Sequence, residues 1–568
     1  MDRLTTQFQN LEINSSLTNY SFERINRFRP NVPHLNRNAL EAHQRVLYNS
    51  FRRYLYPDQI DRILYDFIRH EITEDLILAD FFTGNVPHFK VYKCDNYFKA
   101  LDITSAAFKP PRPTRPVHIF DVQHQYPFRN RSNAEPPFST DKYFLDKLQP
   151  NLRPSTGNMK PIIFDYTRLW HHQIKDGTEP THRHFYYMLL HLKTALVQTS
   201  GPPKVRSIFG VPKPWIIAQI MFLWPLFAYY KKNKGSTPLL WGYETFNGGW
   251  MRLNYELFRS HARASYMMID WKRFDKFLHF SVIDDLFVVI RRYLNFSQGY
   301  IPTSDYPDTE TNWTSLKSRR LERLWQWSID AFHQTPVVLP NGEMYSRNFA
   351  GLPSGLYATQ YLDSMYNYLM IVTTLLELCV FTPNMIIKIM GDDSLAKLEL
   401  FIPPSEHSNF LLDVKQTALS IFNSTISVEK SKITNCLNGV EILSYTNHNG
   451  LPHRDPISLL AQFYHTKARN PTPSKTMASA IGFAYASCGF DEQLYRVCRD
   501  IFTLYKNQGY SPDPTGLYLA LGEDPFGLHL NIDLDDFPSK SYIQAKLTCL
   551  DYQTSTEWFW NTEHFLAE

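Results

Sequence analysis

The chain has 568 residues, 43 % of them apolar and 20 % charged, which excludes a disordered protein and allows more than one hydrophobic core. A net charge of +4 excludes any argument from overall basicity, so a site for a polyanion must be a local concentration of lysine and arginine. The six cysteines form no CxxC pair, which argues against a disulfide framework or a zinc site and fits a reducing compartment.

The first 160 residues are rich in proline, asparagine, arginine and aromatics, with helix-like pieces such as 43–72. The segment Lys109–His118 contains four prolines in ten residues and is predicted to be an irregular loop. Further along, helical periodicity becomes clearer from His184 to Gln198, which predicts a helix there.

Two apolar runs, 215–230 and 369–381, are the candidates for membrane spans. The first contains Gln219 and Pro225, and the second is only 13 residues long and contains Glu377. Both fall short of the roughly 20 uninterrupted apolar residues that a span needs. They are therefore predicted to be core segments, and no membrane partner is expected.

Three short β-like runs follow residue 260, at 265–270, 384–390 and 439–445. Long helical patterns, 358–381 and 410–424, lie between them. This alternation predicts an α+β fold in which an antiparallel sheet is backed by helices on one face. Beyond residue 452 the pattern is helical again, which predicts a separate helical sub-domain.

The motif Gly391-Asp392-Asp393 stands between two of the β-like segments, a strong signal for a hairpin turn. A hairpin tip would carry both carboxylates beyond the edge of the sheet. Asp270 ends another apolar strand, and together the three carboxylates would make the oxygen cage that Mg²⁺ prefers. The competing interpretation is an ordinary solvated turn.

Several other polar residues fit the same site. Asp275 follows Asp270 by five residues and would lie where a sugar hydroxyl is bound, or would be a helix N-terminal charge. Ser354-Gly355 predicts a flexible loop. The helix after it aligns Thr359, Asp363 and Asn367 in one polar stripe, suited to a 2′-hydroxyl unless it is simply the solvated face.

Basic residues complete the set. Lys204 and Arg206 would share one face of an extended chain and could grip a triphosphate, although an ordinary charged strand face is the alternative. Lys430 or Lys432 could donate a proton to departing pyrophosphate, or be a surface lysine. The segment 315–325 could contact the phosphates of a polyanion through its basic side chains or be a solvated helix face. Those side chains are Lys317, Arg319, Arg320 and Arg323.

In this order the motifs resemble those of viral RNA-directed RNA polymerases. The resemblance is carried by K-x-R, D-x4-D, SG-x3-T, GDD, a late lysine in EKSK, and EILSY. Residues 340–367 and the serine after GDD are similar to the partitivirus polymerases of double-stranded RNA viruses, with picobirnaviruses nearby. The clear resemblance runs from about residue 200 to 450.

The resemblance implies two Mg²⁺ ions, with Mn²⁺ as a substitute, held by Asp270 and Asp392 with Asp393 as a weaker ligand. It implies that Ser354 and Gly355 follow the template and that Lys430 is the general acid. The remaining implied NTP contacts are Lys204, Arg206, Asp275, Thr359, Asp363 and Asn367. Four residues past Thr359 many positive-strand virus polymerases have asparagine where this chain has Asp363, so Asp363 and Asn367 both stay candidates for the ribose contact.

The implied fold is a right hand of fingers, palm and thumb. The expected division is 1–200 N-terminal extension and fingers, 201–261 fingers with the phosphate prong, 262–284 palm, 285–345 fingers insertion, 346–449 palm, and 450–568 thumb and tail. The implied partners are viral RNA template and product, NTPs and a capsid protein, in the virion interior or host cytoplasm.

The predicted activity is template-directed nucleotidyl transfer that replicates and transcribes a double-stranded RNA genome. A reverse transcriptase is disfavoured, because Asp275 with Thr359 and Asn367 suits a site that welcomes a 2′-hydroxyl. An inactive RNA-binding virion protein is the other alternative, and the retention of every carboxylate that the chemistry needs argues against it.

Overall fold

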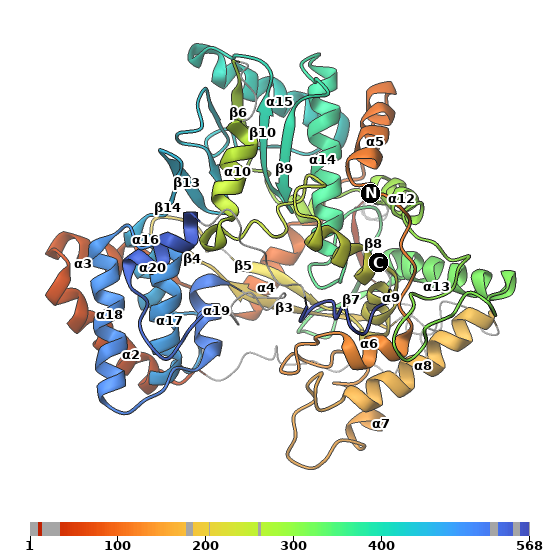
Figure 1. Ribbon diagram of the computed structural model, residues 1–568, viewed down its shortest axis with the longest axis horizontal. Coiled ribbons are helices and arrows are strands. Elements are labelled where there is room, and N and C mark those ends of the chain that lie inside the picture. Colours follow the sequence, from red (N-terminus) through yellow and green to blue (C-terminus); the bar gives the residue numbers. More distant parts are fainter. Residues whose placement is uncertain are drawn as a thin grey trace, which may run out of the picture.

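The computed structural model describes residues 9–13, 35–177, 186–203, 205–258, 263–522, 532–548 and 557–566. Within these ranges the chain is a mixture of helices and four β-sheets (Figure 1). Lys204, half of the expected phosphate prong, lies outside the described residues.

The central sheet is four-stranded and antiparallel. Its strands follow the order β11 (Lys432–Thr434), β6 (Ser265–Met268), β10 (Asp393–Leu398) and β9 (Ile386–Met390). Both of its faces are buried, since Met267 and Ala396 belong to one hydrophobic cluster and Met268 and Leu395 to another. The expected antiparallel sheet is therefore present, with apolar packing on both sides.

Two long helices lie beside this sheet. Helix α14 (Thr359–Glu377) contacts β9 and α15 (His407–Phe422), as Figure 1 shows. Both match the predicted helical patterns within a few residues. The third β-like run was wrongly expected in the same sheet. It forms β12 (Glu441–Ile442) and the start of β13 (Tyr445–His448), which pair with β14 (Leu451–His453) in a sheet of their own.

A five-stranded sheet stands below the central one in Figure 1, in the order β1 (Leu11–Ile13), β8 (Met344–Arg347), β7 (Val337–Val338), β3 (Met188–Thr194) and β5 (Val205–Gly210). The helix expected from His184 to Gln198 is wrong over its described part. That part is strand β3 and strand β4 (Leu196–Gln198), and β4 pairs with β2 (Phe67–Arg69). Six residue pairs between β3 and β5 outweigh the local helical pattern.

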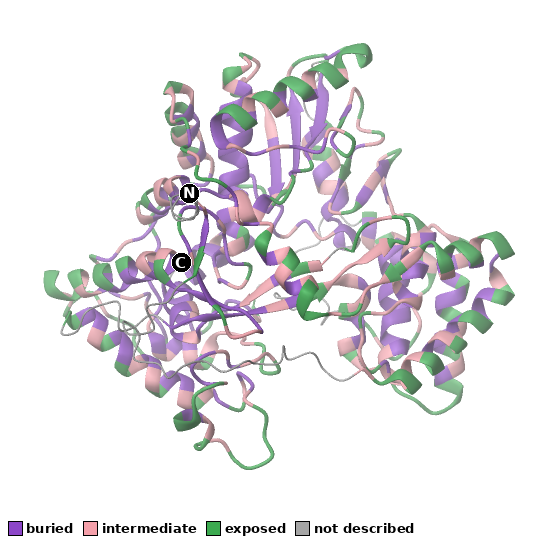
Figure 2. Ribbon diagram, turned by 180° about the vertical axis from the view of Figure 1, so that it is seen from behind, coloured by how far each residue is buried: buried purple, intermediate pink, exposed green. Residues whose placement is uncertain are grey.

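The helical lobe consists of α2 (Arg37–Tyr54), α3 (Pro57–Tyr65), α16 (Pro456–Tyr464), α17 (Pro473–Ala486) and α18 (Glu492–Asn507). These helices share one hydrophobic cluster although they come from opposite ends of the chain. Their buried faces point inward and their exposed faces outward (Figure 2). The side chain of His43, on α2, connects the N-terminal helices of this lobe to the C-terminal ones. Its Nδ1 lies 3.0 Å from Thr476 Oγ1 and its Nε2 lies 2.9 Å from the Phe463 carbonyl oxygen.

Helix α9 (Lys213–Lys232) is almost wholly buried and contains Pro225, as expected of a core segment. No described helix is long and apolar enough to cross a membrane. The C-terminal residues 557–566 pack on α9, where the Trp224 indole donates to the Phe559 carbonyl oxygen at 2.9 Å.

The remaining helices complete the layers around these sheets. They are α4 (Glu74–Phe82), α5 (Asp95–Ala107), α6 (Ile119–Gln125), α7 (Lys142–Leu145), α8 (Lys160–Asp176), α10 (Gly249–Phe258), α11 (Phe274–Phe277), α12 (Phe280–Arg291), α13 (Ser315–Gln334), α19 (Leu517–Leu521) and α20 (Lys540–Thr548).

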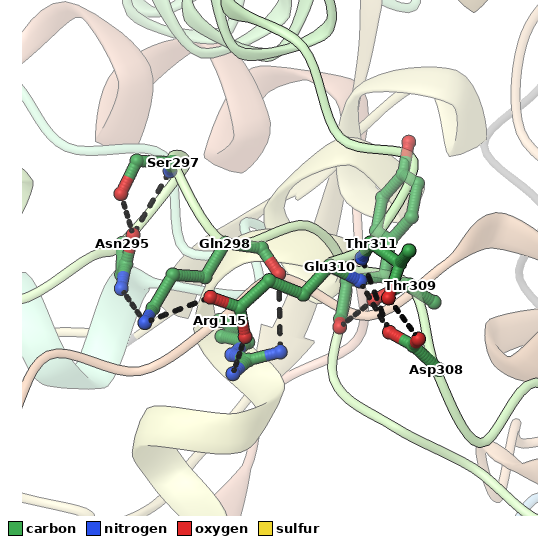
Figure 3. Close-up of polar contacts among 9 residues, drawn as sticks. Arg115, Asn295, Ser297, Gln298, Asp308, Thr309, Glu310 and Thr311 are labelled. Carbon is green, nitrogen blue, oxygen red and sulfur yellow. Dashed lines mark hydrogen bonds and ion pairs between the residues drawn. The ribbon is translucent and has the colours of Figure 1, made fainter.

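The proline-rich segment Lys109–His118 is the predicted irregular loop. Figure 3 shows how it is fixed to the loop between α12 and α13. The Arg115 guanidinium donates to the Gln298 carbonyl oxygen at 3.0 Å and to a Glu310 carboxylate oxygen at 3.1 Å. Asp308 in turn accepts from the backbone nitrogens of Glu310 and Thr311.

Candidate active site

The GDD motif forms the predicted hairpin turn between β9 and β10. Gly391 has φ +66°, which suits the first central position of a tight hairpin turn. Helix α14 fixes this turn from behind, since the Gly391 backbone nitrogen donates to Ser364 Oγ at 2.9 Å and its carbonyl oxygen accepts from Asn367 Nδ2 at 2.9 Å. Asp392 is exposed at the tip.

Asp270 lies at the same edge of the central sheet. Leu395 of β10 pairs with Met268 of β6, and continuing that register by two residues brings Asp270 opposite Asp393. Neighbouring strands are about 4.8 Å apart, and β6 itself ends at Met268, two residues before Asp270, so the convergence of the Asp270 and Asp392 side chains stays a prediction. The Asp270 carboxylate is exposed like that of Asp392.

The segment before β11 holds the backbone of Asp270. The Asp270 nitrogen donates to Ser431 Oγ at 3.0 Å, and its carbonyl oxygen accepts from the Ser427 nitrogen at 2.8 Å. Lys430 is exposed in the turn between these two serines. Lys432 begins β11 opposite Met268. Lys430 is thus carried by the stretch of chain that clamps Asp270.

Asp393 is turned toward a different partner. Its Oδ2 accepts from the Leu443 nitrogen at 2.7 Å. Leu443 and Ser444 both have positive φ, the geometry of a two-residue type I′ turn between β12 and β13. Burial is the main reason that the pKa of Asp393 rises to about 6, and the nearby carboxylate of Asp392 adds to the rise.

Two further carboxylates face this edge. Burial raises the pKa of Asp275, on α11, and repulsion from Asp80 and Asp392 adds to it, while Lys276 and Arg206 oppose the rise. Burial also raises the pKa of Asp363 far above its ordinary value, with repulsion from Asp275 and Asp392. Within the described chain, Asp363 Oδ1 is a buried oxygen that no hydrogen bond satisfies.

The other members of the polar stripe on α14 are engaged in holding the backbone. Asn367 is fully buried, and its Oδ1 accepts from the Trp271 indole nitrogen at 2.8 Å while its Nδ2 bonds to Gly391. Thr359 Oγ1 donates to the Pro353 carbonyl oxygen at 2.8 Å. Of the three, Asp363 is the one with a buried oxygen that no hydrogen bond satisfies.

The Ser354-Gly355 loop rests on strand β5. Ser354 Oγ donates to the Ser207 carbonyl oxygen at 3.0 Å. A Cβ on Gly355 would come within 1.9 Å of the Phe209 carbonyl oxygen, so only glycine fits at this close approach. This contact brings the loop next to the strand that carries Arg206.

Arg206 is exposed on β5, and the register places Lys193 of β3 directly opposite it. Two cationic side chains in directly opposed positions concentrate positive charge at this point of the strand pair. Lys193 was not among the residues predicted from the sequence, because its segment was expected to be helical. An alternating polar and apolar pattern from Leu190 to Lys193 was the available signal.

The basic side chains of α13 are mostly used within the protein. Arg320 makes an ion pair of 2.6 Å with Asp176, and Arg323 donates to the carbonyl oxygens of Lys175 and Asp176. Lys317 donates to the Asn312 carbonyl oxygen at 2.7 Å. These contacts fix α13 to α8 and to its preceding loop, and the expected RNA contact of this helix stays a prediction.

The exposed oxygens of Asp270 and Asp392 are the hard donors that Mg²⁺ prefers, and the mutual repulsion of the surrounding carboxylates is the charge imbalance that a divalent cation relieves.

Elsewhere in the described chain, ligand atoms of Asp121, Asp305 and His564 lie within 4.8 Å of one another. Both ring nitrogens of His564 are already occupied there, by Asp121 at 2.8 Å and Ser304 at 2.9 Å.

A family model described as viral RNA-dependent RNA polymerase matches residues 188–502, more than half of the chain. The chain belongs to this family and is an RNA-directed RNA polymerase, which acts on an RNA template and NTPs.

Its relatives include the RNA-directed RNA polymerase of White clover cryptic virus 1, a partitivirus, which is 42 % identical over 98 % of this chain and 97 % of the relative. The RNA-directed RNA polymerase of Atkinsonella hypoxylon virus is 24 % identical over 88 % of this chain and 79 % of the relative. These relatives identify the chain as the polymerase of a cryptic, double-stranded RNA virus, as the motifs predicted.

Proposed function

We propose that the polymerase extends RNA at the edge of the central sheet by two-metal nucleotidyl transfer, and that it both replicates and transcribes the viral genome. The observation that supports this proposal is the antiparallel pairing of β6 with β10, since Asp270 lies two residues past the end of β6 and Asp392 directly precedes β10. Asp270 and Asp392 would hold two Mg²⁺ ions, or Mn²⁺ in their place, with Asp393 as an occasional ligand. Ions bound there would activate the 3′-hydroxyl and neutralise charge on the phosphates.

The architecture supports a right-hand polymerase in which the central sheet is the palm. The five-stranded sheet with α8, α9 and α13 would form the fingers, and the helical lobe would form the thumb. Because α2 and α3 share the core of that lobe, we assign residues 37–65 to the thumb region as well. The other expected boundaries stay as predicted.

The two opposed cations on β3 and β5 would grip the triphosphate. The guanidinium of Arg206 would bind phosphate oxygens in pairs and Lys193 would add a point charge. Lys204 is proposed with them from its sequence position alone. Ser354 and Gly355 would follow the template from their position against β5.

The ribose would be read by Asp275 and Asp363. Asp363 is preferred over Asn367 because its oxygen is unsatisfied whereas both polar atoms of Asn367 hold the backbone of the site. Thr359 and Asn367 would act by fixing the loops around the ribose. Lys430, on the segment that clamps Asp270, would give a proton to departing pyrophosphate.

Template and product RNA would lie between the three parts of the hand. A capsid protein is proposed as a partner and the virion interior or host cytoplasm as the location, on the strength of the viral family.

The test is RNA synthesis on a defined RNA template with NTPs, dNTPs and Mg²⁺. Asp270→Asn and Asp392→Asn should each lower the rate by on the order of 10³-fold, because each removes an anionic ligand at the point where charge develops. The wild type should prefer NTPs. Activity unaltered by both substitutions, or a preference for dNTPs, would contradict the proposal.

A further inference from the structure

Asp80, at the end of helix α4, is the meeting point of three segments of the site. Its Oδ2 accepts from the backbone nitrogen of Ser207 at 3.1 Å and from the Ser207 hydroxyl at 2.5 Å. Its Oδ1 accepts from the Lys276 ammonium at 2.7 Å, and that ammonium also donates to the Asp80 carbonyl oxygen at 2.6 Å. The Asp80 side chain thus accepts hydrogen bonds from Ser207 on β5 and forms an ion pair with Lys276 on α11.

Each partner of Asp80 is next to a residue of the proposed NTP site. Ser207 follows Arg206 on β5, and Lys276 follows Asp275 on α11. Ser207 also accepts, through its carbonyl oxygen, the hydroxyl of Ser354. The residue proposed to bind phosphate, the carboxylate proposed to bind ribose and the template loop are therefore each within two contacts of Asp80.

The bond to Ser207 also sets the direction of Arg206. Successive side chains of a strand point to opposite faces. With the buried Ser207 side chain turned toward α4, the neighbouring Arg206 must point to the other face, where it is exposed beside Lys193. A weakened bond to Ser207 would loosen the anchor that keeps β5 in this orientation.

The bond between Asp80 and Lys276 holds helix α11 in place, as the bond to Ser207 holds β5. This helix has only four residues, Phe274–Phe277, and the residue before it, Arg273, has φ +52°. So short a helix has little stability of its own. Lys276 also lines a cavity of about 40 Å³ beside Asp275 and Leu352.

We propose that Asp80 is a positioning residue for nucleotide binding, which fixes the distance between the triphosphate grip at Arg206 and the ribose contact at Asp275. This inference rests on the proposed function. Asp80 does not touch the nucleotide itself; it acts through Ser207 and Lys276. Loss of its carboxylate should therefore weaken NTP binding and the choice between NTP and dNTP while metal binding at Asp270 and Asp392 persists.

The experiment compares steady-state kinetics of Asp80→Ala, Asp80→Asn and the wild type, with the active fraction determined by a single-turnover burst. Asp80→Ala should raise the KM for NTP by about tenfold and lower the preference for NTP over dNTP, since small displacements of a positioned group are costly. Asp80→Asn retains an acceptor for Ser207 but loses the charge that holds Lys276, and should be intermediate. Asp75→Ala, an exposed carboxylate in the first turn of the same helix, is the matched control.

A purely structural role gives a different result, namely a smaller active fraction with unchanged KM and unchanged discrimination in both Asp80 variants. That result would overturn the inference. Arg206→Ala separates this failure from failure of the proposed function. If Arg206→Ala raises the KM for NTP and the Asp80 variants do not, the role of Asp80 is wrong. If Arg206→Ala leaves the KM unchanged, the phosphate assignment on which the inference rests is wrong as well.

Discussion

Asn367 binds the GDD turn directly, with its Nδ2 2.9 Å from the carbonyl oxygen of Gly391. The other end of the same amide accepts from the indole of Trp271, the residue after Asp270. One buried side chain of α14 therefore links the two strand ends that carry Asp270 and Asp392. The relative position of the two carboxylates therefore depends on this amide as well as on the pairing of β6 with β10.

Asn367→Ala should impair both folding and catalysis. It leaves the Trp271 indole and the Gly391 carbonyl oxygen without these partners in a buried place, and each unsatisfied group costs about 1–3 kcal/mol. We expect the free energy of unfolding in urea to fall by about 2 kcal/mol or more and kcat to fall with NTP and dNTP alike. Thr373→Val is the control, since the Thr373 hydroxyl bonds to Leu369 of its own helix. Equal effects of the two substitutions on kcat would contradict this role.

Asp363→Ala should act on sugar selection instead. The buried oxygen of Asp363 is unsatisfied, and a site built to bond a hydroxyl rejects analogues that lack it by large factors. We expect the preference for NTP over dNTP to fall by about tenfold or more, measured as the ratio of kcat/KM values on one RNA template. If Asn367→Ala changed this ratio and Asp363→Ala did not, the two assignments would have to be exchanged.

Removal of either opposed cation should raise the KM for NTP. Arg206→Ala and Lys193→Ala each take away charge from a strand pair in which the two side chains face one another. We expect an increase of about tenfold for each, a smaller one for Arg206→Lys, and weaker effects at high salt because ions screen exposed charges. Lys142→Ala on the distant helix α7 is the control. An unchanged KM for Lys193→Ala would remove that residue from the grip.

His43 should make the helical lobe sensitive to acid. Burial lowers its pKa from 6.5 to about 4, so the folded state binds its proton less readily than the unfolded state. Its contribution to stability is present above pH 6.5 and is lost as the pH falls from 6.5 toward 4. At pH 5 the loss amounts to about 2 kcal/mol.

Urea unfolding of the wild type at pH 7.5 and pH 5.0 measures this loss. His43→Gln should be less stable than the wild type at pH 7.5 but should lose less stability between the two pH values. His448→Gln, at an exposed histidine of β13, should retain the full pH dependence. A pH dependence unchanged by His43→Gln would show that another group is responsible.

Local patterns were sufficient to predict the elements around the candidate site. The hairpin at Gly391 and the helix from Thr359 follow from turn chemistry and periodicity, which act within a few residues, as does a strand before Asp270, although that strand ends at Met268. The error over residues 184–198 has a different cause. Strand β3 exists because β5 and β7 pair with it, and β7 is more than 100 residues away in the chain, so no local pattern contains that information.

The residues that hold the site in place could not be predicted from the sequence for the same reason. Asp80 is one carboxylate in an ordinary helical segment, and only the folded chain brings it to Ser207 and Lys276. The choice between Asp363 and Asn367 likewise needed the contacts of Gly391 and Trp271. Sequence identifies residues whose chemistry is unusual for their place, whereas the residues that hold them depend on tertiary contacts.

The most direct test of the proposed two-metal site is the anomalous diffraction of Mn²⁺ in crystals of the polymerase with RNA and NTP. We expect manganese between the carboxylates of Asp270 and Asp392, and its loss from that place in Asp392→Asn. Manganese bound at Asp121, Asp305 and His564 but absent from the edge of the central sheet would contradict it.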